Sequence, residues 1–165
     1  ALAKLQENYD VHIITQNIDD LHERAGSKKV LHLHGEIRKA RSTANADLIY
    51  EIDGWELMEG EKCDRGSQLR PHIVWFGELV PELENAARIV SLADLFIVIG
   101  TSLQVYPAAG LVEYAPFEAD KFYIDPKAEV LRGDFKIIKE NAGTGVPNLL
   151  NSLQGFSILN SELRN

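Results

Sequence analysis

Polar side chains follow several short apolar runs of the sequence, at the positions where the strands of a sheet would end. Gln16–Asp20 comes after one run, and His34 and Gly35 come after the next. Gly100–Ser102 and Asp125 follow two later runs. In open parallel sheets, ligands bind beyond the carboxyl ends of the strands. These residues are therefore the first candidates for chemistry.

His34 has the residue type of a general base. An imidazole with an ordinary pKa of about 6.5 is suited to take a proton from a hydroxyl group near neutral pH. Strand alternation predicts that His32 shares the face of His34 and that Leu31 and Leu33 lie opposite. A strand histidine is also commonly a hydrogen-bonded structural residue, so the residues alone leave both roles open. The other histidines are interpreted as structural or surface residues: His12, His22 and His72.

The polar stretch after the first run has a structural interpretation as well. Asn17 followed three residues later by Asp20 resembles a capping box at a helix start. Asp19 would lie in the first turn, where a carboxylate complements the helix dipole. From the residues alone, capping is favoured. Only the clustering of these groups with His34 argues for a ligand.

Gly100, Thr101 and Ser102 could form a phosphate-binding loop. A glycine lets the backbone approach a phosphate, and the two hydroxyls can donate hydrogen bonds. The motif is weak, because a glycine where a strand meets a loop is common. Asp125 could accept hydrogen bonds from ribose hydroxyls, as the acid of dinucleotide-binding folds does. It could equally start a turn before Pro126.

Six short runs of apolar and β-branched residues alternate with helical stretches. This pattern predicts an α/β fold, with a Rossmann-like parallel sheet and helices on both of its faces. Leu95–Gly100 lacks polar alternation, as expected of a central strand that is buried on both faces. The predicted strands are Val11–Thr15, Val30–His34, Ile73–Phe76, Leu95–Ile99, Phe122–Ile124 and Phe135–Ile138.

Proline and glycine mark the expected helix ends. Pro81 suits the first position of a helix whose apolar residues recur at i, i+3, i+4 and i+7 within residues 83–90. Gly26 can close a helix, and Pro107 and Pro147 can each open one. These three helices are predicted over Asp19–Ala25, Ala108–Ala115 and Asn148–Leu153.

Residues 36–69 break the pattern, because they are rich in charge and glycine and show no sustained period. We interpret them as a small inserted module. Residues 1–35 and 70–165 would then form the Rossmann-like domain. The apolar residues of the module predict a satellite hydrophobic cluster. They are Leu48, Ile49, Tyr50, Ile52, Trp55, Leu57 and Met58.

Charge and cysteine content exclude several classes of function. The formal net charge is −8, with 17 Lys and Arg against 25 Asp and Glu, which argues against nucleic-acid binding. Cys63 is the single cysteine, so we expect no disulfide and a reducing, cytoplasmic location. No apolar run reaches the roughly 20 residues of a membrane span. The first residues resemble the middle of a helix, which predicts further sequence upstream.

Four motifs together resemble the sirtuin family, in that family's order and approximate spacing. Thr15–Gly26 reads TQNIDDLHERAG, and Leu33–Glu36 reads LHGE. Pro71–Glu78 reads PHIVWFGE, and Gly100–Pro107 reads GTSLQVYP. The resemblance covers residues 8–147, which is most of the chain. It implies an NAD-consuming protein lysine deacylase.

The resemblance implies roles in NAD binding for the residues after the strands. His34 would be the catalytic base that deprotonates a hydroxyl of the nicotinamide ribose. Asn17 and Asp19 would hold this ribose and the nicotinamide carboxamide, and Asn17 is counted with His34 in catalysis. Family members commonly have asparagine at the position of Asp125. The implied NAD-binding residues are Gln16, Asn17, Ile18, Asp19, Gly100, Thr101, Ser102, Asp125 and Ala142.

The implied substrate is an acylated lysine in a protein or peptide. In this family the peptide lies between two loops as an added β-strand, and the matching segments are Val74–Glu78 and Ser102–Val105. The acyl-lysine carbonyl oxygen attacks the nicotinamide ribose, nicotinamide leaves, and the acyl group passes to ADP-ribose. The implied substrate-binding residues are Val74, Trp75, Phe76, Gly77, Glu78 and Val105.

The sequence departs from the family in two respects. The family's glycine-rich Gly-Ala-Gly loop, with its nearby arginine, would precede residue 1. The cysteine pairs that bind structural zinc in the family are absent, although residues 36–69 have a similar length, so no zinc is expected. Two other functions stay open: a non-catalytic nucleotide-binding domain, and a module that binds acyl-lysine peptides without turnover.

Overall fold

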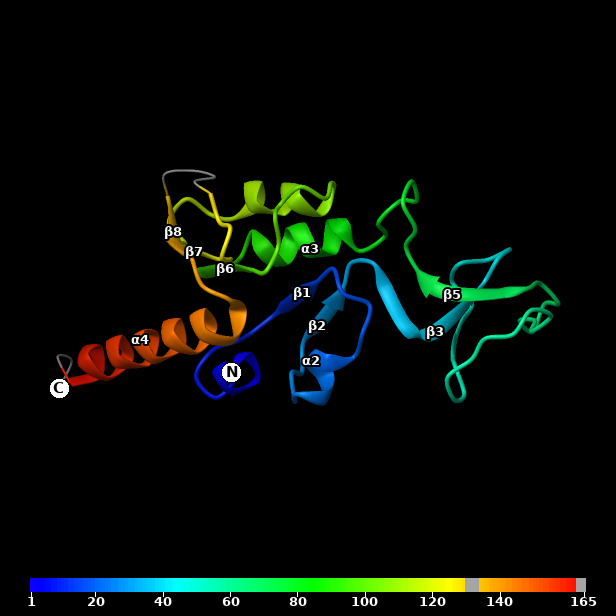
Figure 1. Ribbon diagram of the computed structural model, residues 1–165, viewed down its shortest axis with the longest axis horizontal. Coiled ribbons are helices and arrows are strands. Elements are labelled where there is room, and N and C mark those ends of the chain that lie inside the picture. The colour runs from blue at the N-terminus through cyan, green and yellow to red at the C-terminus, as the bar shows by residue number, and fades with distance from the viewer. Residues whose placement is uncertain (130–133, 163–165) are drawn as a thin grey trace. The chain divides into compact units, whose positions relative to one another are not determined.

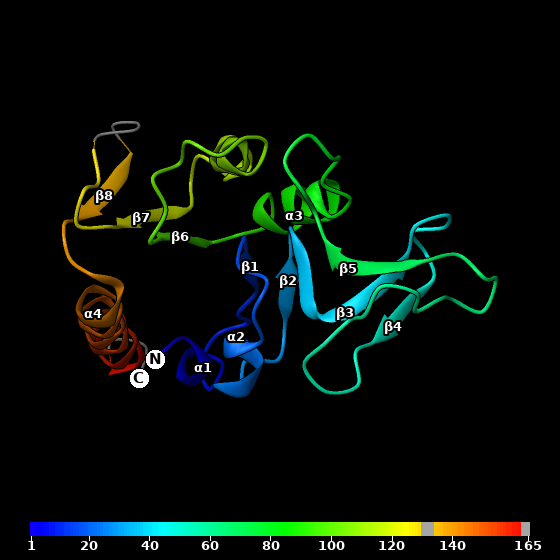
Figure 2. The ribbon, with the colours of Figure 1, turned by 45° about the vertical axis from the view of Figure 1, so that its right-hand side comes forward.

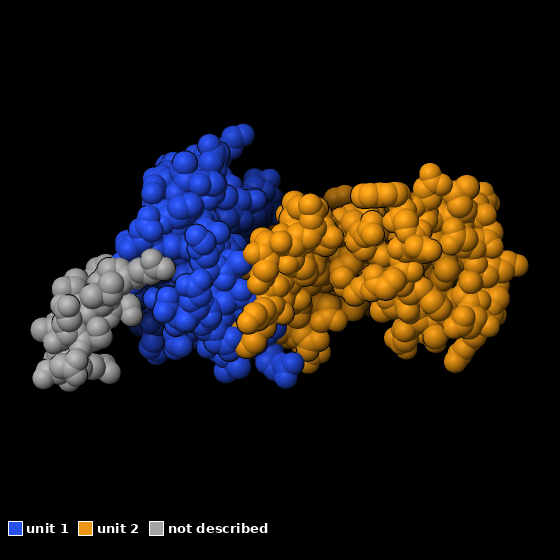
Figure 3. All heavy atoms as spheres, turned by 90° about the horizontal axis from the view of Figure 1, so that it is seen from below, with its two compact units in different colours: residues 1–11, 87–165 blue, residues 12–86 orange. Residues whose placement is uncertain are grey.

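A computed structural model describes residues 1–129 and 134–162 of the chain. They form two units, shown in different colours in Figure 3. Unit 1 contains residues 1–11 and 87–165, and unit 2 contains residues 12–86. Each unit is described by itself below.

Unit 2 begins with a parallel pair of strands that carries the candidate base. β1 (Ile13–Thr15) pairs with β2 (Val30–His32), and Thr15 lies opposite His32. The short helix α2 (Leu21–Arg24) lies between them in the chain. The predicted strand Val11–Thr15 is confirmed over its last three residues, and Val30–His34 over its first three. β2 ends at His32, so His34 lies in the turn after the strand and the prediction from strand alternation does not apply to it.

The rest of unit 2 is an antiparallel sheet with the order β4-β3-β5 (Figure 2). Its strands are β3 (Gly35–Ser42), β4 (Ile49–Glu51) and β5 (Leu69–Ile73). The predicted strand Ile73–Phe76 is wrong, because β5 ends at Ile73 and a turn follows. The segment that forms this sheet includes the predicted inserted module, residues 36–69, and it begins before the module, at Gly35, and ends after it, at Ile73. The domain division itself stays a prediction.

The satellite hydrophobic cluster predicted for the module is wrong. Trp55 is 93% exposed, and Met58 and Ile49 are also exposed. The Trp55 ring instead lies against the Arg38 guanidinium, whose Cζ is 5.3 Å from the ring centroid. A short three-stranded sheet has little volume to enclose large side chains. Small residues are buried here in their place: Ala40, Ser42 and Cys63.

Unit 1 contains three parallel strands in the order β6-β7-β8 (Figure 1). They are β6 (Leu95–Ile99), β7 (Asp120–Ile124) and β8 (Phe135–Ile138), which confirms three predicted strands. The middle strand of this sheet is β7. The prediction that Leu95–Ile99 is central is therefore wrong for this sheet, and the most deeply buried strand residues belong to β7.

Helices cover both faces of this sheet. Phe122 and Ile124 of β7 pack with Leu149 of α4 (Ala142–Glu162) and with Leu5 of α1 (Leu2–Leu5). Tyr123 points to the opposite face, because neighbouring strand residues alternate. There it packs in a second cluster. Its other members are Val98, Ala128 and Phe135, with Phe96, Leu103, Val112 and Ile137 packed against them.

The helix ends are partly as predicted. α3 (Leu83–Val90) confirms the helix after Pro81, and the helix after Pro107 is a 3₁₀ helix, η1 (Ala108–Tyr114). The start predicted at Pro147 is wrong, because α4 begins at Ala142 and contains this proline. The Asn141 carbonyl accepts the first two helical hydrogen bonds, and Pro147 then removes only one later bond. Within residues 1–129 and 134–162, no helix has both the length and the apolar character that a membrane span requires.

Candidate functional site

Three consecutive carbonyl oxygens after β1 are each held by a hydrogen bond. The Gln16 oxygen lies 3.1 Å from Nδ1 of His34, and the Asn17 oxygen lies 3.1 Å from Nδ1 of His32. The Ile18 oxygen accepts the backbone N–H of Ile37 at 2.8 Å. The polar segment after β1 and the histidine after β2 are therefore joined at the carboxyl ends of two neighbouring parallel strands.

The contact of His34 determines which ring nitrogen can act as a base. A backbone carbonyl only accepts hydrogen bonds, so Nδ1 of His34 must carry the hydrogen that it donates to Gln16. In the neutral ring, the lone pair is then on Nε2. This arrangement orients the imidazole and leaves Nε2 to accept a proton, as a general base requires.

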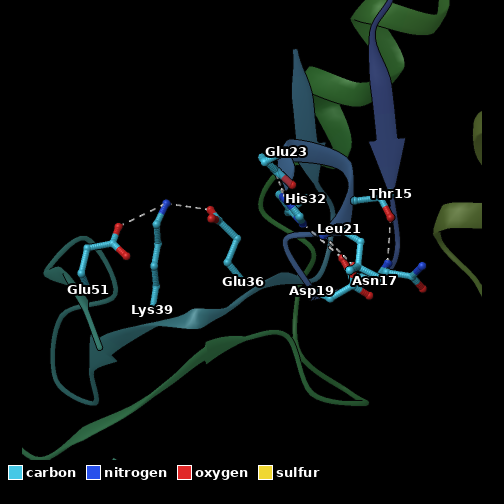
Figure 4. Close-up of polar contacts among 9 residues, drawn as sticks. All are labelled: Thr15, Asn17, Asp19, Leu21, Glu23, His32, Glu36, Lys39 and Glu51. Carbon is cyan, nitrogen blue, oxygen red and sulfur yellow. Dashed lines mark hydrogen bonds and ion pairs between the residues drawn. The ribbon is translucent and has the colours of Figure 1, made fainter. Parts of the chain in front are cut away.

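His32 is held as a cation. Its Nδ1 faces the Asn17 carbonyl, and its Nε2 lies 2.8 Å from Oε1 of Glu23 (Figure 4). Both partners are acceptors, so both ring nitrogens carry hydrogen. Burial lowers the pKa of His32, but the hydrogen bonds to Glu23 and Asn17 and the charges of Glu23 and Glu36 outweigh it. The pKa of His32 therefore lies above its ordinary value.

The capping role predicted for Asn17 is wrong. α2 starts at Leu21 with Asp20 as its N-cap residue, and the Asp20 side chain makes no capping hydrogen bond. Asp19 takes this role instead, because its Oδ1 accepts the Leu21 N–H at 3.1 Å. The Asn17 N–H donates to Oγ1 of Thr15 at 3.0 Å, and the Asn17 side chain extends away from His32 (Figure 4).

In unit 1, the predicted NAD-binding residues also follow neighbouring parallel strands. Gly100 comes after β6, with φ +61°, and its N–H donates to the Ile124 carbonyl at 2.9 Å. Asp125 comes after β7, and its N–H donates to the Ile138 carbonyl at 3.2 Å. Ala142 begins α4 after β8. Gly100, Asp125 and Ala142 thus lie beyond the carboxyl ends of the strands of one parallel sheet.

Tyr123 supports the loop after β6, and the sequence analysis did not single it out. Its buried hydroxyl donates to the Thr101 carbonyl at 2.8 Å. Burial, followed by the carboxylates of Asp125 and Glu129, raises the pKa of Tyr123. Oγ1 of Thr101 accepts the N–H of Leu103, so both ends of this residue are fixed. The sequence signal for this role was a tyrosine between two apolar residues of a predicted strand, Phe122 and Ile124.

Asp125 occupies the turn that was one of its two predicted roles. Its Oδ1 accepts the Lys127 N–H at 2.7 Å, and its carbonyl accepts the Ala128 N–H at 3.0 Å. A short aspartate side chain that binds the backbone two residues later is typical of turns before or around proline. The ribose contact stays a prediction.

The predicted substrate segment after β5 is a turn. The Val74 N–H donates to the His34 carbonyl at 2.9 Å, so the segment starts beside the candidate base. Trp75 and Phe76 are exposed, whereas Glu78 bonds with arginines of unit 2. Val105, in unit 1, is exposed just before η1.

Comparisons with known proteins identify the class of protein. The profile of the Sir2 family matches residues 1–107. An NAD-dependent protein deacylase of Bacteroides thetaiotaomicron is 48% identical over 155 residues, which cover 90% of this chain and 66% of that protein. Another from Helicobacter pylori is 50% identical over 157 residues, which cover 93% and 67%. The chain belongs to the Sir2 family, and it spans about two thirds of the length of these relatives.

Solved structures share the fold. A mutant Sir2 homologue in complex with ADP ribose aligns with a TM-score of 0.82 and 37% identity, over 96% of this chain and 66% of that one. A Sir2 structure with a p53 peptide and NAD⁺ aligns with a TM-score of 0.75 and 30% identity, over 92% and 67%. These similarities confirm the α/β fold class.

The surroundings of Cys63 do not fit the zinc site of the family. Tetrahedral structural zinc requires four cysteine or histidine ligands, and the described residues contain no group of three or more metal-binding side chains. The Cys63 thiol is hydrogen-bonded to Ser42, which holds the pKa of the thiol below its ordinary value. Oγ of Ser42 also accepts the N–H groups of Ala44 and Asn45, at 3.2 and 3.3 Å. That zinc is absent stays a prediction, which chelation can test.

Proposed function

We propose that the protein is an NAD-dependent protein lysine deacylase and that His34 is its general base. The observation that carries this proposal is the hydrogen bond from Nδ1 of His34 to the Gln16 carbonyl. It orients the ring and leaves Nε2 as the proton acceptor. Two observations support the same activity. The relatives are named as NAD-dependent protein deacylases, and the similar solved structures are complexes with ADP ribose or with a p53 peptide and NAD⁺.

In the proposed reaction, the acyl-lysine carbonyl oxygen attacks the nicotinamide ribose, and the bond to nicotinamide breaks. Nε2 of His34 removes a proton from a ribose hydroxyl, which then attacks the acyl carbon. The acyl group passes to ADP-ribose, and the lysine amine is released. Atom balance requires one water molecule for each acyl group transferred. NAD is consumed, and no hydride moves.

In unit 2, the proposed binding groups follow β1. Asn17 with Gln16, Ile18 and Asp19 would hold the nicotinamide ribose and carboxamide. The loop after β6, with Gly100, Thr101 and Ser102, would hold phosphates and the adenosine ribose. A glycine with a positive φ and an adjacent hydroxyl suits the close approach of a phosphate, and Gly100 has this backbone conformation. Asp125 and Ala142 would complete the adenosine end.

The proposed partner is an acylated lysine in a protein or peptide, with Val74–Glu78 and Val105 on the substrate side. A cytoplasmic location and the absence of nucleic-acid and membrane partners stay predictions of the sequence. The relatives named as protein deacylases support the class of substrate. The acyl group is not assigned.

The test is nicotinamide release from NAD and an acetyl-lysine peptide by the full-length protein. His34→Ala is expected to lower turnover by about 10²–10⁴-fold, the usual contribution of a general base. NAD binding, measured by calorimetry, should change little. His12→Ala is the matched control, because His12 is an exposed histidine before β1. Near-normal turnover of His34→Ala would refute the assignment. Peptide binding by the parent without nicotinamide release would support a binding module instead.

A further inference from the structure

The side chain of Glu78 is turned back onto its own loop. Its Oε2 accepts the backbone N–H of Trp75 at 3.0 Å and Nη2 of Arg41 at 3.1 Å. Arg70 donates to both carboxylate oxygens, through Nη1 to Oε1 and through Nη2 to Oε2. The carboxylate therefore has four hydrogen bonds, and three of them come from guanidinium groups.

The same two arginines also bind the end of β5. Nη2 of Arg41 and Nη2 of Arg70 each donate to the Ile73 carbonyl at 3.2 Å. Arg41 belongs to β3 and its side chain is only 12% exposed. The network thus joins Arg41 of β3 to the last residue of β5 and to the carboxylate of Glu78, which lie 32 and 37 residues later in the sequence. Hydrogen bonds that involve charged groups are stronger than neutral ones.

The charge of Glu78 is fixed at every physiological pH. Hydrogen bonds from Arg70 and from the Trp75 N–H, together with the charges of Arg70 and Arg41, lower the pKa of Glu78 to about 2. Both guanidinium groups stay protonated. The three side chains therefore keep their charges in this pH range, and the network does not act as a pH switch.

The network closes a tight turn. The Trp75 carbonyl accepts the Glu78 N–H at 3.0 Å, and Gly77 has φ +88° at the third position of the turn, as a type II turn requires. The Trp75 N–H is bonded to the Glu78 carboxylate, so both backbone groups of Trp75 are engaged. Phe76, at the tip, is 99% exposed. Its exposed ring adds no packing that could hold the turn.

We propose that Glu78, Arg41 and Arg70 position the Val74–Glu78 turn for the acylated peptide, and that the Glu78 carboxylate is not itself a contact for the substrate. This inference rests on the proposed function. A loop that is ordered before binding loses less conformational entropy when the peptide docks. Because two guanidinium groups already bind the carboxylate, the peptide meets the backbone and the exposed aromatic side chains of the turn.

The test compares Glu78→Gln and Arg41→Lys with the control Glu59→Gln in the full-length protein. Glu59 is an exposed glutamate of the same unit, outside the proposed site. The first readout is amide hydrogen exchange at Trp75 in the absence of substrate. The second is the steady-state kinetics of nicotinamide release, with the peptide and NAD varied separately. Glu78→Asp is added as the conservative variant that keeps the charge.

For Glu78→Gln, we expect amide exchange at Trp75 and the KM for the peptide each to rise about tenfold, because charge-assisted hydrogen bonds are lost. The KM for NAD and kcat should stay near the parent values. Arg41→Lys should change the same two readouts in the same direction by less, and Glu78→Asp should partly restore them.

Three outcomes would overturn the inference. One is unchanged amide exchange at Trp75 in Glu78→Gln, and another is an unchanged KM for the peptide. The third is an equal rise in both KM values, which is what a general loss of structure would produce. If the parent itself releases no nicotinamide, the proposed function fails instead. Positioning is then decided by amide exchange and by the calorimetric affinity for an acetyl-lysine peptide.

Discussion

Replacing Gly35 with alanine tests the junction between the candidate base and the antiparallel sheet. Gly35 follows His34 and has φ +79°, in the region that L-residues rarely adopt. A Cβ added here would lie 2.0 Å from the His72 carbonyl oxygen and 3.0 Å from Cα of Ile73. Both neighbours are backbone atoms of β5, so no side-chain rotation relieves the clash.

The magnitude follows from two costs. The left-handed backbone conformation costs an L-residue roughly 1–2 kcal/mol. Moving β5 away weakens its pairing with Gly35 and the Val74 to His34 hydrogen bond, and each lost bond costs roughly 1 kcal/mol. The backbone conformation and the two bonds together give about 3–4 kcal/mol, at the upper end of point-mutation effects.

The assay is urea unfolding followed by circular dichroism, with Gly54→Ala as the matched control. Gly54 has φ +84°, but a Cβ there meets nothing within 4 Å. The control therefore measures the cost of the backbone conformation alone. We expect Gly35→Ala to lose about 2 kcal/mol more than Gly54→Ala, which is the contribution of the two weakened bonds. Equal losses would show that β5 accommodates the methyl group, and the argument from close approach would be wrong.

Three further predictions concern other parts of the molecule. Gly145→Ala should destabilise unit 1, because its Cβ would lie 2.6 Å from Cγ2 of Ile124. Gly143→Ala is the control, because a Cβ there meets nothing within 4 Å. Its higher helix propensity should raise the free energy of unfolding in urea by roughly 0.5–1 kcal/mol. The raised pKa of His32 means that its cationic contacts stabilise the fold fully below the unfolded value of about 6.5 and are lost as pH rises through the higher folded value. The melting temperature of the parent should therefore exceed that of His32→Gln most near pH 6, and a difference that grows toward pH 9 would contradict this. EDTA should leave the melting temperature unchanged, and one zinc per chain by elemental analysis would show that Cys63 does belong to a metal site.

The sequence predicted strands well where apolar runs are continuous. Leu95–Ile99 and Phe135–Ile138 are confirmed to the residue, because burial in a parallel sheet selects such runs directly. The strand at Ile73–Phe76 was wrong because its apolar residues belong partly to a turn. Gly77 carries the signal for that turn, but the apolar residues before it, Val74, Trp75 and Phe76, also match the pattern of a strand.

Contacts between distant charged residues could not be predicted from the sequence. Arg41 and Glu78 are 37 residues apart, and neither spacing nor local pattern connects them. The predicted hydrophobic cluster around Trp55 was wrong for a different reason, which is the shape of the sheet. Its residues have the right chemistry, but a thin sheet cannot enclose them, so the ring lies on the surface against Arg38.

The base at His34 was predicted from its residue type and motif, but its tautomer required the structure. A strand histidine could donate through either nitrogen, and only the contact of Nδ1 with the Gln16 carbonyl selects Nε2 as the acceptor. Likewise, the sequence placed His32 beside His34 by alternation. The structure instead gives each ring its own carbonyl, and it gives His32 a carboxylate that makes it a cation.

His34 connects two parts of the proposed site through two different atoms. Its ring binds the Gln16 carbonyl of the NAD-side segment, and its own carbonyl accepts the Val74 N–H at the start of the substrate turn. A displacement of His34 must therefore alter the NAD-side segment and the substrate turn at once. Gly35→Ala should accordingly raise the KM values for NAD and for the peptide together, whereas Glu78→Gln, which acts at the far end of the Val74–Glu78 turn, should raise only that for the peptide. If Gly35→Ala is folded and changes the two KM values by very different factors, His34 does not couple the NAD-side segment to the substrate turn.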